Sequence, residues 1–141
     1  MKVLFDTNVV LDVLMDRHPF ADIAVRLFVS VEQGDVTGYL CSTTITTVHY
    51  LSAKVLGAAR AQGEIRKLLT LFEVAPVNRP VLESALNANF ADFEDAVAHE
   101  AARHVGADAI VTRNQKDFTG AGISVFTPTE LSAILDIRNT T

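Results

Sequence analysis

The chain has 141 residues, of which 49% are hydrophobic, with a mean hydropathy of +0.26 and a formal net charge of −5. This length and composition exclude a disordered chain and predict a single domain over residues 1–141. No apolar run approaches the roughly 18 residues of a membrane helix, and the single cysteine, Cys41, excludes an intrachain disulfide, so we expect a cytoplasmic protein without a membrane anchor.

Short apolar runs alternate with longer helical patterns along the chain. In chain order we expect a strand over 2–5, helices over 9–14 and 21–33, a strand over 37–41, helices over 44–53 and 58–71, a strand over 72–75, helices over 80–86 and 91–104, strands over 109–111 and 124–126, and a helix over 128–135. This alternation favours a three-layer α/β/α sandwich whose central sheet has about five mostly parallel strands.

The first candidate site residue follows the first strand. Asp6 comes directly after the apolar run Val3-Leu4-Phe5 and opens the segment Asp6-Thr7-Asn8. Open α/β sheets form their ligand crevices at the carboxyl ends of their strands. The position of Asp6 therefore predicts a carboxylate at the edge of such a crevice.

Hydroxyl groups accumulate after the second strand, in the run 42–50. We expect Ser42 or Thr43 to cap the helix that follows, and we interpret His49 as a packed residue of that helix. The four histidines lack a common metal-ligand spacing and Cys41 has no cysteine partner, so a structural zinc site is not expected.

The helix over 91–104 carries a second acidic group. Asp92, Asp95 and His99 are spaced to lie along one stripe, and Glu94 falls about 100° away from Asp95. Asp92 is either the helix N-cap or a metal ligand, and Glu94 is either a favourable first-turn charge or a ligand. Asp95 lies next to a strongly apolar stripe, and we predict that it is functional.

A third polar segment follows the strand over 109–111. It reads Thr112-Arg113-Asn114-Gln115-Lys116-Asp117-Phe118, and its place at a strand end matches that of Asp6. Thr112 or Asn114 could simply cap a short helical turn. Together with Asp6 and Asp95, the segment is instead expected to contribute Asp117 to a shared acidic pocket, with Asn114 holding a metal-bound water or ligand.

Crowded carboxylates repel one another, and the usual remedy is a hard divalent cation. The negative net charge does not favour nucleic-acid binding by itself, but bound cations would reverse the local sign of the pocket. We also expect a basic rim around it. The candidates for this rim are Arg17, Arg26, Lys54, Arg60, Arg66, Lys67, Arg113 and Lys116.

Three segments together resemble the PIN domain, the nuclease fold of VapC-type toxins in bacterial toxin–antitoxin pairs. They are the opening 3–8, the middle 92–96 and the run 110–118, and the ending 125–128 is also similar to the closing strand and helix of that family. The likeness therefore spans nearly the whole chain, although each segment is a weak signal alone.

The resemblance implies a Mg²⁺- or Mn²⁺-dependent ribonuclease that hydrolyses RNA phosphodiester bonds. Asp6 and Asp95 would be primary metal ligands, completed by Asp117 and Asn114. Contacts to substrate or support of these ligands are expected from Asn8, Thr47, Asp92, Glu94, Thr112, Arg113 and Asn114. The resemblance also implies a small antitoxin that inserts a peptide over the pocket, and a homodimer. Surplus apolar residues over 21–33 or 44–71 could supply the dimer face, and core packing explains them equally well.

The chain departs from this family in one place. The family usually has a glutamate at the start of the helix after its second strand, whereas the run 42–50 contains no acidic residue. Glu94 or Asp92 could compensate, and Thr47 could contact the water shell of a metal. The alternative is a catalytically weak or inactive PIN-like module that binds RNA or protein. A phosphotransfer protein with an aspartate nucleophile would need a second aspartate at position 8, where this chain has Asn8.

Overall fold

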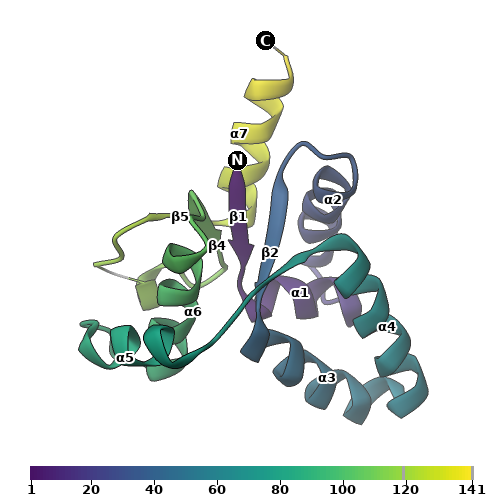
Figure 1. The fold of residues 1–141 in the computed structure, drawn as a ribbon. Coiled ribbons are helices and arrows are strands. Elements are labelled where there is room, and N and C mark those ends of the chain that lie inside the picture. The colour runs from purple at the N-terminus through teal and green to yellow at the C-terminus, as the bar shows by residue number, and fades with distance from the viewer. Residues whose placement is uncertain (119, 141) are drawn as a thin grey trace.

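The computed structural model describes residues 1–118 and 120–140, and a five-stranded parallel sheet runs through its centre (Figure 1). The strands lie in the order β3-β2-β1-β4-β5, and each neighbouring pair is parallel. They are β1 Lys2–Phe5, β2 Thr37–Cys41, β3 Glu73–Ala75, β4 Ala109–Val111 and β5 Ser124–Phe126. All five strands lie where the sequence predicts them, apart from a one-residue shift at the start of β3.

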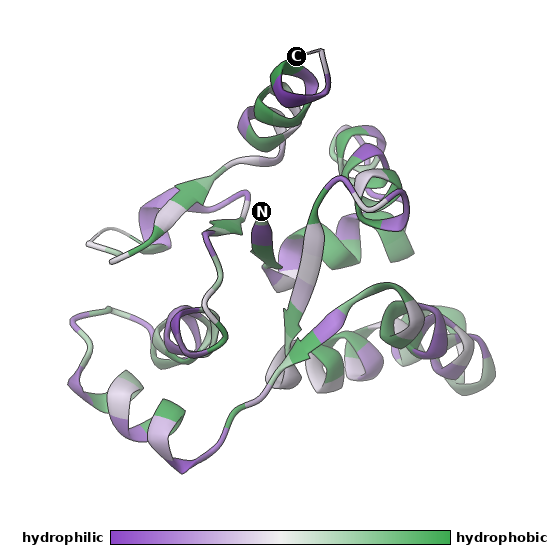
Figure 2. Ribbon diagram, turned by 45° about the horizontal axis from the view of Figure 1, so that its top comes forward, coloured by the Kyte–Doolittle hydropathy of each residue, from purple (hydrophilic) through white to green (hydrophobic). Residues whose placement is uncertain are grey.

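Helices connect the strands and cover both faces of the sheet (Figure 1). They are α1 Thr7–Leu14, α2 Ala21–Glu32, α3 Ser42–Leu56, α4 Ala58–Leu71, α5 Arg79–Asn87, α6 Phe93–His104 and α7 Pro128–Asn139, and a short 3₁₀ helix, η1, spans Gln115–Phe118. The predicted α/β/α sandwich with a parallel sheet is therefore confirmed. Figure 2 shows hydrophobic and hydrophilic residues alternating around the helices, the pattern of amphipathic helices packed on a sheet.

Side-chain alternation along the strands builds one apolar core on each face. In β1, Val3 and Phe5 point into the core shared with α1, α2, α3, α4 and α7, whereas Leu4 points into the core shared with α5 and α6. In β4, Val111 and Ile110 divide between the same two cores. This two-residue period leaves the central strands buried on both faces, as parallel sheets require.

The strand order reverses at β1. From β1 the chain passes to β2 and β3 on one side, and later returns to β4 and β5 on the other. Helical connections leave on opposite sides of such a point, so a crevice opens at the carboxyl ends of the two strands. Asp6 directly follows β1 and Thr112 directly follows β4, and the Asp6 backbone N–H donates to the Val111 carbonyl at 3.0 Å.

Four helix starts differ from the sequence expectation, because α1 and α3 begin two residues earlier, α5 one residue earlier and α6 two residues later. The prediction that Ser42 or Thr43 caps α3 is wrong, because Cys41 occupies the N-cap position and offers no side-chain cap bond. The Ser42 hydroxyl instead accepts a hydrogen bond from the Val77 backbone N–H at 3.1 Å, and Thr43 Oγ1 lies 3.1 Å from Cys41 Sγ. The helix over α6 starts two residues later than expected, because Asp92 caps it.

Within residues 1–118 and 120–140, no helix has both the length and the apolar character needed to cross a membrane.

Gly38 in β2 is required by close packing. A Cβ atom there would lie 2.6 Å from two ring atoms of Phe72 and 3.1 Å from a methyl group of Val31. The Phe72 ring is held edge-on between Phe5 and Phe28, with centroids 5.0 and 5.1 Å away, so it has little room to move. We expect Gly38→Ala to lower the free energy of unfolding by about 2–3 kcal/mol, the cost of overpacking a core, measured by urea denaturation.

Gly63→Ala is the matched control. Gly63 lies within α4, and nothing lies within 4 Å of the position its Cβ would take. The same added methyl group should raise stability there by about 0.5–1 kcal/mol, because glycine is unfavourable inside a helix. Equal stability of the Gly38→Ala variant and the unmodified protein would contradict the packing argument.

Candidate active site

A pocket of about 310 Å³ lies at the carboxyl ends of β1 and β4, and its wall is largely polar, with more carboxylates than cations. It draws side chains from segments far apart in the chain. Its carboxylates are Asp6, Glu94, Asp95 and Asp117, its cations are Arg17 and Arg113, and its other polar side chains are Thr7, Asn8, Thr43, Thr44, Thr47 and Asn114. The structure thus brings together the three carboxylates that the sequence proposes as ligands. Their role in metal binding stays a prediction.

Asp6 is fixed by hydrogen bonds on both of its carboxylate oxygens. It caps α1, with Oδ1 accepting from the Thr7 N–H at 2.9 Å. Its Oδ2 accepts from the Thr112 hydroxyl at 2.7 Å and from the Asn8 amide at 3.2 Å. Burial raises the pKa of Asp6, and the bond from Thr112 acts in the opposite direction. The carboxylate is therefore oriented, and its remaining lone pairs are available to a ligand.

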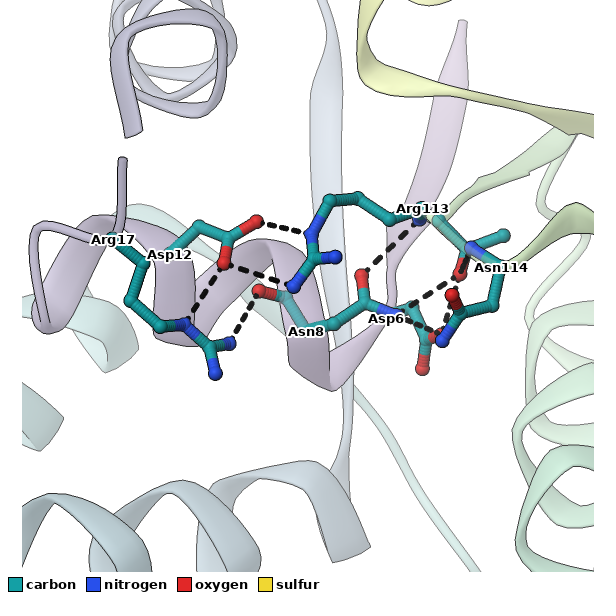
Figure 3. A network of polar contacts seen from close by, with 7 residues as sticks. Asp6, Asn8, Asp12, Arg17, Arg113 and Asn114 are labelled. Carbon is teal, nitrogen blue, oxygen red and sulfur yellow. Dashed lines mark hydrogen bonds and ion pairs between the residues drawn. The ribbon is translucent and has the colours of Figure 1, made fainter. Parts of the chain in front are cut away.

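Thr112 and Asn8 join the segment after β1 to the segment after β4. Figure 3 shows Asp6 and Asn8 of the first segment beside Arg113 and Asn114 of the second. Thr112 is fully buried, and its oxygen also accepts from the Asn114 N–H at 3.0 Å. Asn8 donates to Thr112 and accepts from the Arg113 N–H, both at 3.2 Å. Thr112 does not line the pocket, so it supports Asp6 from behind and has no access to substrate.

Asp95 has the most perturbed carboxyl group of the site. Burial, followed by repulsion from Asp92, Asp6, Asp117 and Glu94, raises its pKa to about 7. The main cause is desolvation, although four negative neighbours also act in the same direction. Asp117 is exposed on η1, yet its charge also raises the pKa of Asp6. The electrostatic coupling links all three predicted ligands.

The predicted stripe on α6 divides into three different roles. Asp92 is the N-cap, accepting from the Asp95 N–H at 3.0 Å, and it lies outside the pocket lining. His99 is buried, with Nδ1 2.6 Å from a Glu100 carboxylate oxygen and Nε2 accepting from the Gly122 N–H at 2.9 Å. Only Asp95 of the stripe reaches the pocket, because Asp92 precedes the helix and His99 lies deep against the loop at Gly122.

The wall from α3 carries hydroxyls where the family usually has a glutamate. Thr43, Thr44 and Thr47 line the pocket there. Thr44 Oγ1 lies 3.0 Å from Thr7 Oγ1, which ties α3 to α1. Of the two residues expected to compensate, Glu94 lines the pocket from α6, whereas Asp92 caps that helix and lies outside the lining. His49 lies outside this lining.

The sequence analysis missed Asp12, which is fully buried in α1. Arg113 donates to it with Nε at 2.7 Å and Nη2 at 3.2 Å, and Arg17 donates with Nε at 3.0 Å (Figure 3). An aspartate inside the apolar run 9–14 was the available signal, since a buried charge requires a partner. Of the predicted basic rim, Arg17 and Arg113 line the pocket, and the other six candidates do not.

The donor set fits a hard divalent cation. Carboxylate, amide and hydroxyl oxygens are the ligands that Mg²⁺ and Mn²⁺ prefer, and a cation would relieve the repulsion that raises the Asp95 pKa. Within the described residues, no three His, Cys, Asp or Glu side chains form a ready-made cage for an ion. Mg²⁺ does not need one, because it keeps several waters and is usually held by one or two carboxylates.

Residues 2–116 match the family model described as PIN domain. Ribonuclease VapC1 of Aquifex aeolicus (strain VF5) is 28% identical over 137 residues, which cover 92% of either chain. A toxin–antitoxin complex from Klebsiella pneumoniae has a chain with a TM-score of 0.68 at 24% identity, covering 89% of this chain and 97% of that one. Mycobacterium tuberculosis VapC20, described as a Sarcin-Ricin loop cleaving toxin, has a TM-score of 0.67 at 18% identity, covering 86% and 95%.

The raised pKa of Asp95 predicts that this residue destabilises the metal-free protein at neutral pH and above. Its proton is bound more tightly in the folded chain, at a pKa of about 7 against an ordinary 3.8, so stability falls as pH rises from about 4 to 7. Asp95→Asn removes the charge and should raise the unfolding free energy at pH 8 by about 1–2 kcal/mol, a value reduced for solvent screening.

Thermal melting of metal-free protein at pH 4, 6 and 8 tests this expectation. The advantage of Asp95→Asn should grow from pH 4 to pH 7 and then level off, while Asp136→Asn at an exposed position of α7 should show no such trend. The favourable effect of a charge in the first turn of α6, about 0.3–1 kcal/mol, opposes the predicted gain. A less stable Asp95→Asn variant at pH 8 would therefore show that this helix effect outweighs the repulsion.

Proposed function

Because the chain belongs to the PIN domain family, we propose that it is a ribonuclease that hydrolyses RNA phosphodiester bonds with Mg²⁺ or Mn²⁺ in the acidic pocket. The observation that carries this proposal is the convergence of Asp6, Asp95 and Asp117 on one pocket from three distant segments. The similarity to Ribonuclease VapC1 supports the same activity.

Asp6 and Asp95 are the proposed primary ligands of the cation, and Asp117 and Asn114 complete the set. Asp6 is suited to this role because Thr7, Thr112 and Asn8 hold its carboxylate in one orientation. Asp95 contributes a carboxylate that gains from an opposite charge, since its neighbours otherwise favour its protonated form. Asp117 adds negative charge from the more exposed side of the pocket.

When bound, a divalent cation neutralises charge on the phosphate oxygens and lowers the pKa of a coordinated water. The protein's own residues then position the reacting groups. The Thr112–Asp6–Asn8 bonds keep the carboxylate from turning away, and buried Thr44 packs the α3 wall against α1. No side chain of the pocket is required as a nucleophile, which agrees with the absence of any Ser-His-Asp or Cys-His pattern in the sequence.

A second candidate function is a PIN module that binds RNA or protein without cutting. One observation favours it, namely that the α3 wall presents Thr43, Thr44 and Thr47 and no acid. Fewer carboxylates would weaken cation binding. Glu94 favours the nuclease instead, because it supplies a fourth carboxylate to the lining from α6. RNA binding with no turnover in Mg²⁺ or Mn²⁺ would support the binding module.

We further propose that the chain is the toxin of a toxin–antitoxin pair and forms a homodimer. The similarity to a chain of a toxin–antitoxin complex from Klebsiella pneumoniae supports a protein partner. An antitoxin peptide that covers the acidic pocket would suppress the nuclease directly. Homodimerisation and the cytoplasmic location stay predictions, which light scattering and cell fractionation would test.

Substitution of the ligands should remove RNA cleavage. We expect Asp6→Asn and Asp95→Asn each to reduce cleavage of single-stranded RNA by at least about 100-fold, because even residues that only support metal ligands cost about 10–100-fold. Addition of EDTA should stop the unmodified enzyme and excess Mn²⁺ should restore it. Asp136→Asn is the control, since it removes a carboxylate outside the pocket. Full activity in both pocket variants would refute the proposal.

Cleavage should also depend on pH in a way that Mg²⁺ concentration changes. Asp95 must lose its proton to bind a cation, so activity at low Mg²⁺ should rise as pH passes through about 7. At saturating Mg²⁺ the cation competes better with the proton, and the midpoint should move to lower pH. Initial rates between pH 5.5 and 8.5 at two Mg²⁺ concentrations measure this. A midpoint that stays fixed would contradict a role for Asp95 as ligand.

A further inference from the structure

The buried carboxylate of Asp12 organises two arginines at the edge of the acidic pocket. Asp12 is fully buried, and both of its oxygens accept hydrogen bonds from guanidinium groups. Arg113 forms a two-pronged contact with it and Arg17 a single one. A buried aspartate without these partners would be strongly unfavourable. The fold therefore holds the guanidinium groups of Arg17 and Arg113 in place.

The two guanidinium groups are further restrained outside Asp12. The guanidinium carbon of Arg113 lies 3.9 Å from the centroid of the Phe20 ring, a distance typical of a cation–π contact. Arg17 donates from Nη2 to the Asn8 carbonyl at 3.2 Å, as Figure 3 shows. Both guanidinium groups bond to residues of α1, so their positions relative to the pocket are nearly fixed.

Both arginines keep N–H donors that their bonds to the protein do not use and that a ligand could accept from. Guanidinium carries five N–H donors, and within the described chain the bonds of Arg113 use Nε and Nη2, while those of Arg17 use Nε and Nη2. The Nη1 group of each has no protein acceptor among these bonds. Both side chains line the pocket and are only partly covered, with exposed fractions of 25% for Arg113 and 38% for Arg17.

The charge balance of the pocket wall favours a negatively charged ligand at these free N–H donors. Two guanidinium groups share one carboxylate, so this part of the wall keeps a net positive charge. The described lining holds no other Lys or Arg, and it also carries four carboxylates in a protein of net charge −5. RNA would be repelled from such a pocket without a local cation, since phosphate contacts depend on Lys and Arg.

We propose that Arg17 and Arg113 form a phosphate clamp, a subsite that binds the RNA phosphate next to the scissile one. This proposal rests on the proposed ribonuclease function and adds a substrate contact to it. A planar guanidinium matches the oxygens of a phosphodiester with two parallel bonds. Asp12 is a positioning residue, because it orients the clamp without touching RNA. A phosphodiester is favoured over an acidic peptide because the clamp and the proposed metal ligands line one pocket.

The test measures RNA affinity and its salt dependence in a background that does not cut. Asp95→Asn serves as this background, and the probe is a fluorescent single-stranded RNA followed by anisotropy at 50–300 mM KCl, on the order of the range where counterion release is measurable. Arg17→Gln and Arg113→Gln are added singly. Each should weaken binding about tenfold at low salt, and should reduce the slope of log Kd against log salt by about 0.7, the value for one lost phosphate contact.

Arg60→Gln provides the matched control, because it removes the same charge from α4, outside the pocket. Arg17→Gln is the more informative variant, since Asp12 keeps both bonds from Arg113 and the fold stays intact. Arg113→Lys gives a second variant that keeps the charge and loses the fork; it should weaken RNA binding with little change in salt slope. Urea denaturation of each variant checks that the fold is preserved.

The outcomes separate the clamp from the ribonuclease function. If the unmodified protein cuts RNA, and folded Arg17→Gln and Arg113→Lys bind RNA with unchanged affinity and salt slope, the clamp is overturned and the nuclease stands. If the arginine variants lose RNA binding but the unmodified protein never cuts RNA in Mg²⁺ or Mn²⁺, the nuclease fails, and of the clamp proposal only the contact between the two arginines and an RNA phosphate stands. If Arg17→Gln loses only binding of a polyglutamate peptide, the subsite is for acidic peptides and the proposal is overturned.

Discussion

The pocket depends on one hydrogen-bonded junction between chain segments more than 100 residues apart. Thr112 donates to Asp6, Asn8 bonds to Thr112, and the Arg113 backbone donates to Asn8. These bonds close the gap between β1 and β4 at the point where the strand order reverses. The same junction orients the Asp6 carboxylate, a candidate metal ligand, and Asp6 also caps the start of α1. It fixes the backbone at Arg113, whose side chain reaches Asp12. Catalytic geometry and local folding are therefore built from the same contacts.

The charged groups around this junction form two sets, one in the interior and one at the pocket surface. Asp12 is buried, and ion pairs with two arginines compensate its negative charge. Asp6, Asp95 and Asp117 face the pocket together, and burial and mutual repulsion raise the pKa of Asp95. The uncompensated like charges thus lie at the pocket, where a ligand is proposed to bind, whereas the compensated charge of Asp12 lies in the interior. Stored repulsion of this kind is typical of functional sites.

The sequence predicted the architecture well because the relevant signals are local. Strand lengths, strand–helix alternation and the Asp6, Asp95 and Asp117 positions all follow from short patterns, and the rule that parallel strands end at one edge brings Asp6 and the 112–117 segment together. The capping role of Asp92 was one of two open readings, and its contact with the Asp95 N–H, together with its place outside the pocket lining, favours the cap.

Features that depend on distant partners were not predictable. Asp12 looked like one polar residue in an apolar helix, because its partner Arg113 lies 101 positions away. Thr112 was expected either to contact substrate or to support the ligands, and only the fold shows that its buried hydroxyl bonds to Asp6. Ser42 was expected to cap α3, but its hydroxyl binds the backbone at Val77, beyond β3. Local patterns specify which groups need partners, whereas only the fold specifies which partners they find.

The central place of β1 has a consequence for the order of events during synthesis. β1 must pair with β4, which is made about a hundred residues later, and Asp117 follows later still. A nascent chain therefore carries Asp6 on a strand with one open edge until β4 has been made. The acidic pocket assembles only when the segment that carries Asp117 can fold against Asp6, so a chain cut short before residue 112 would have β1 but no complete site.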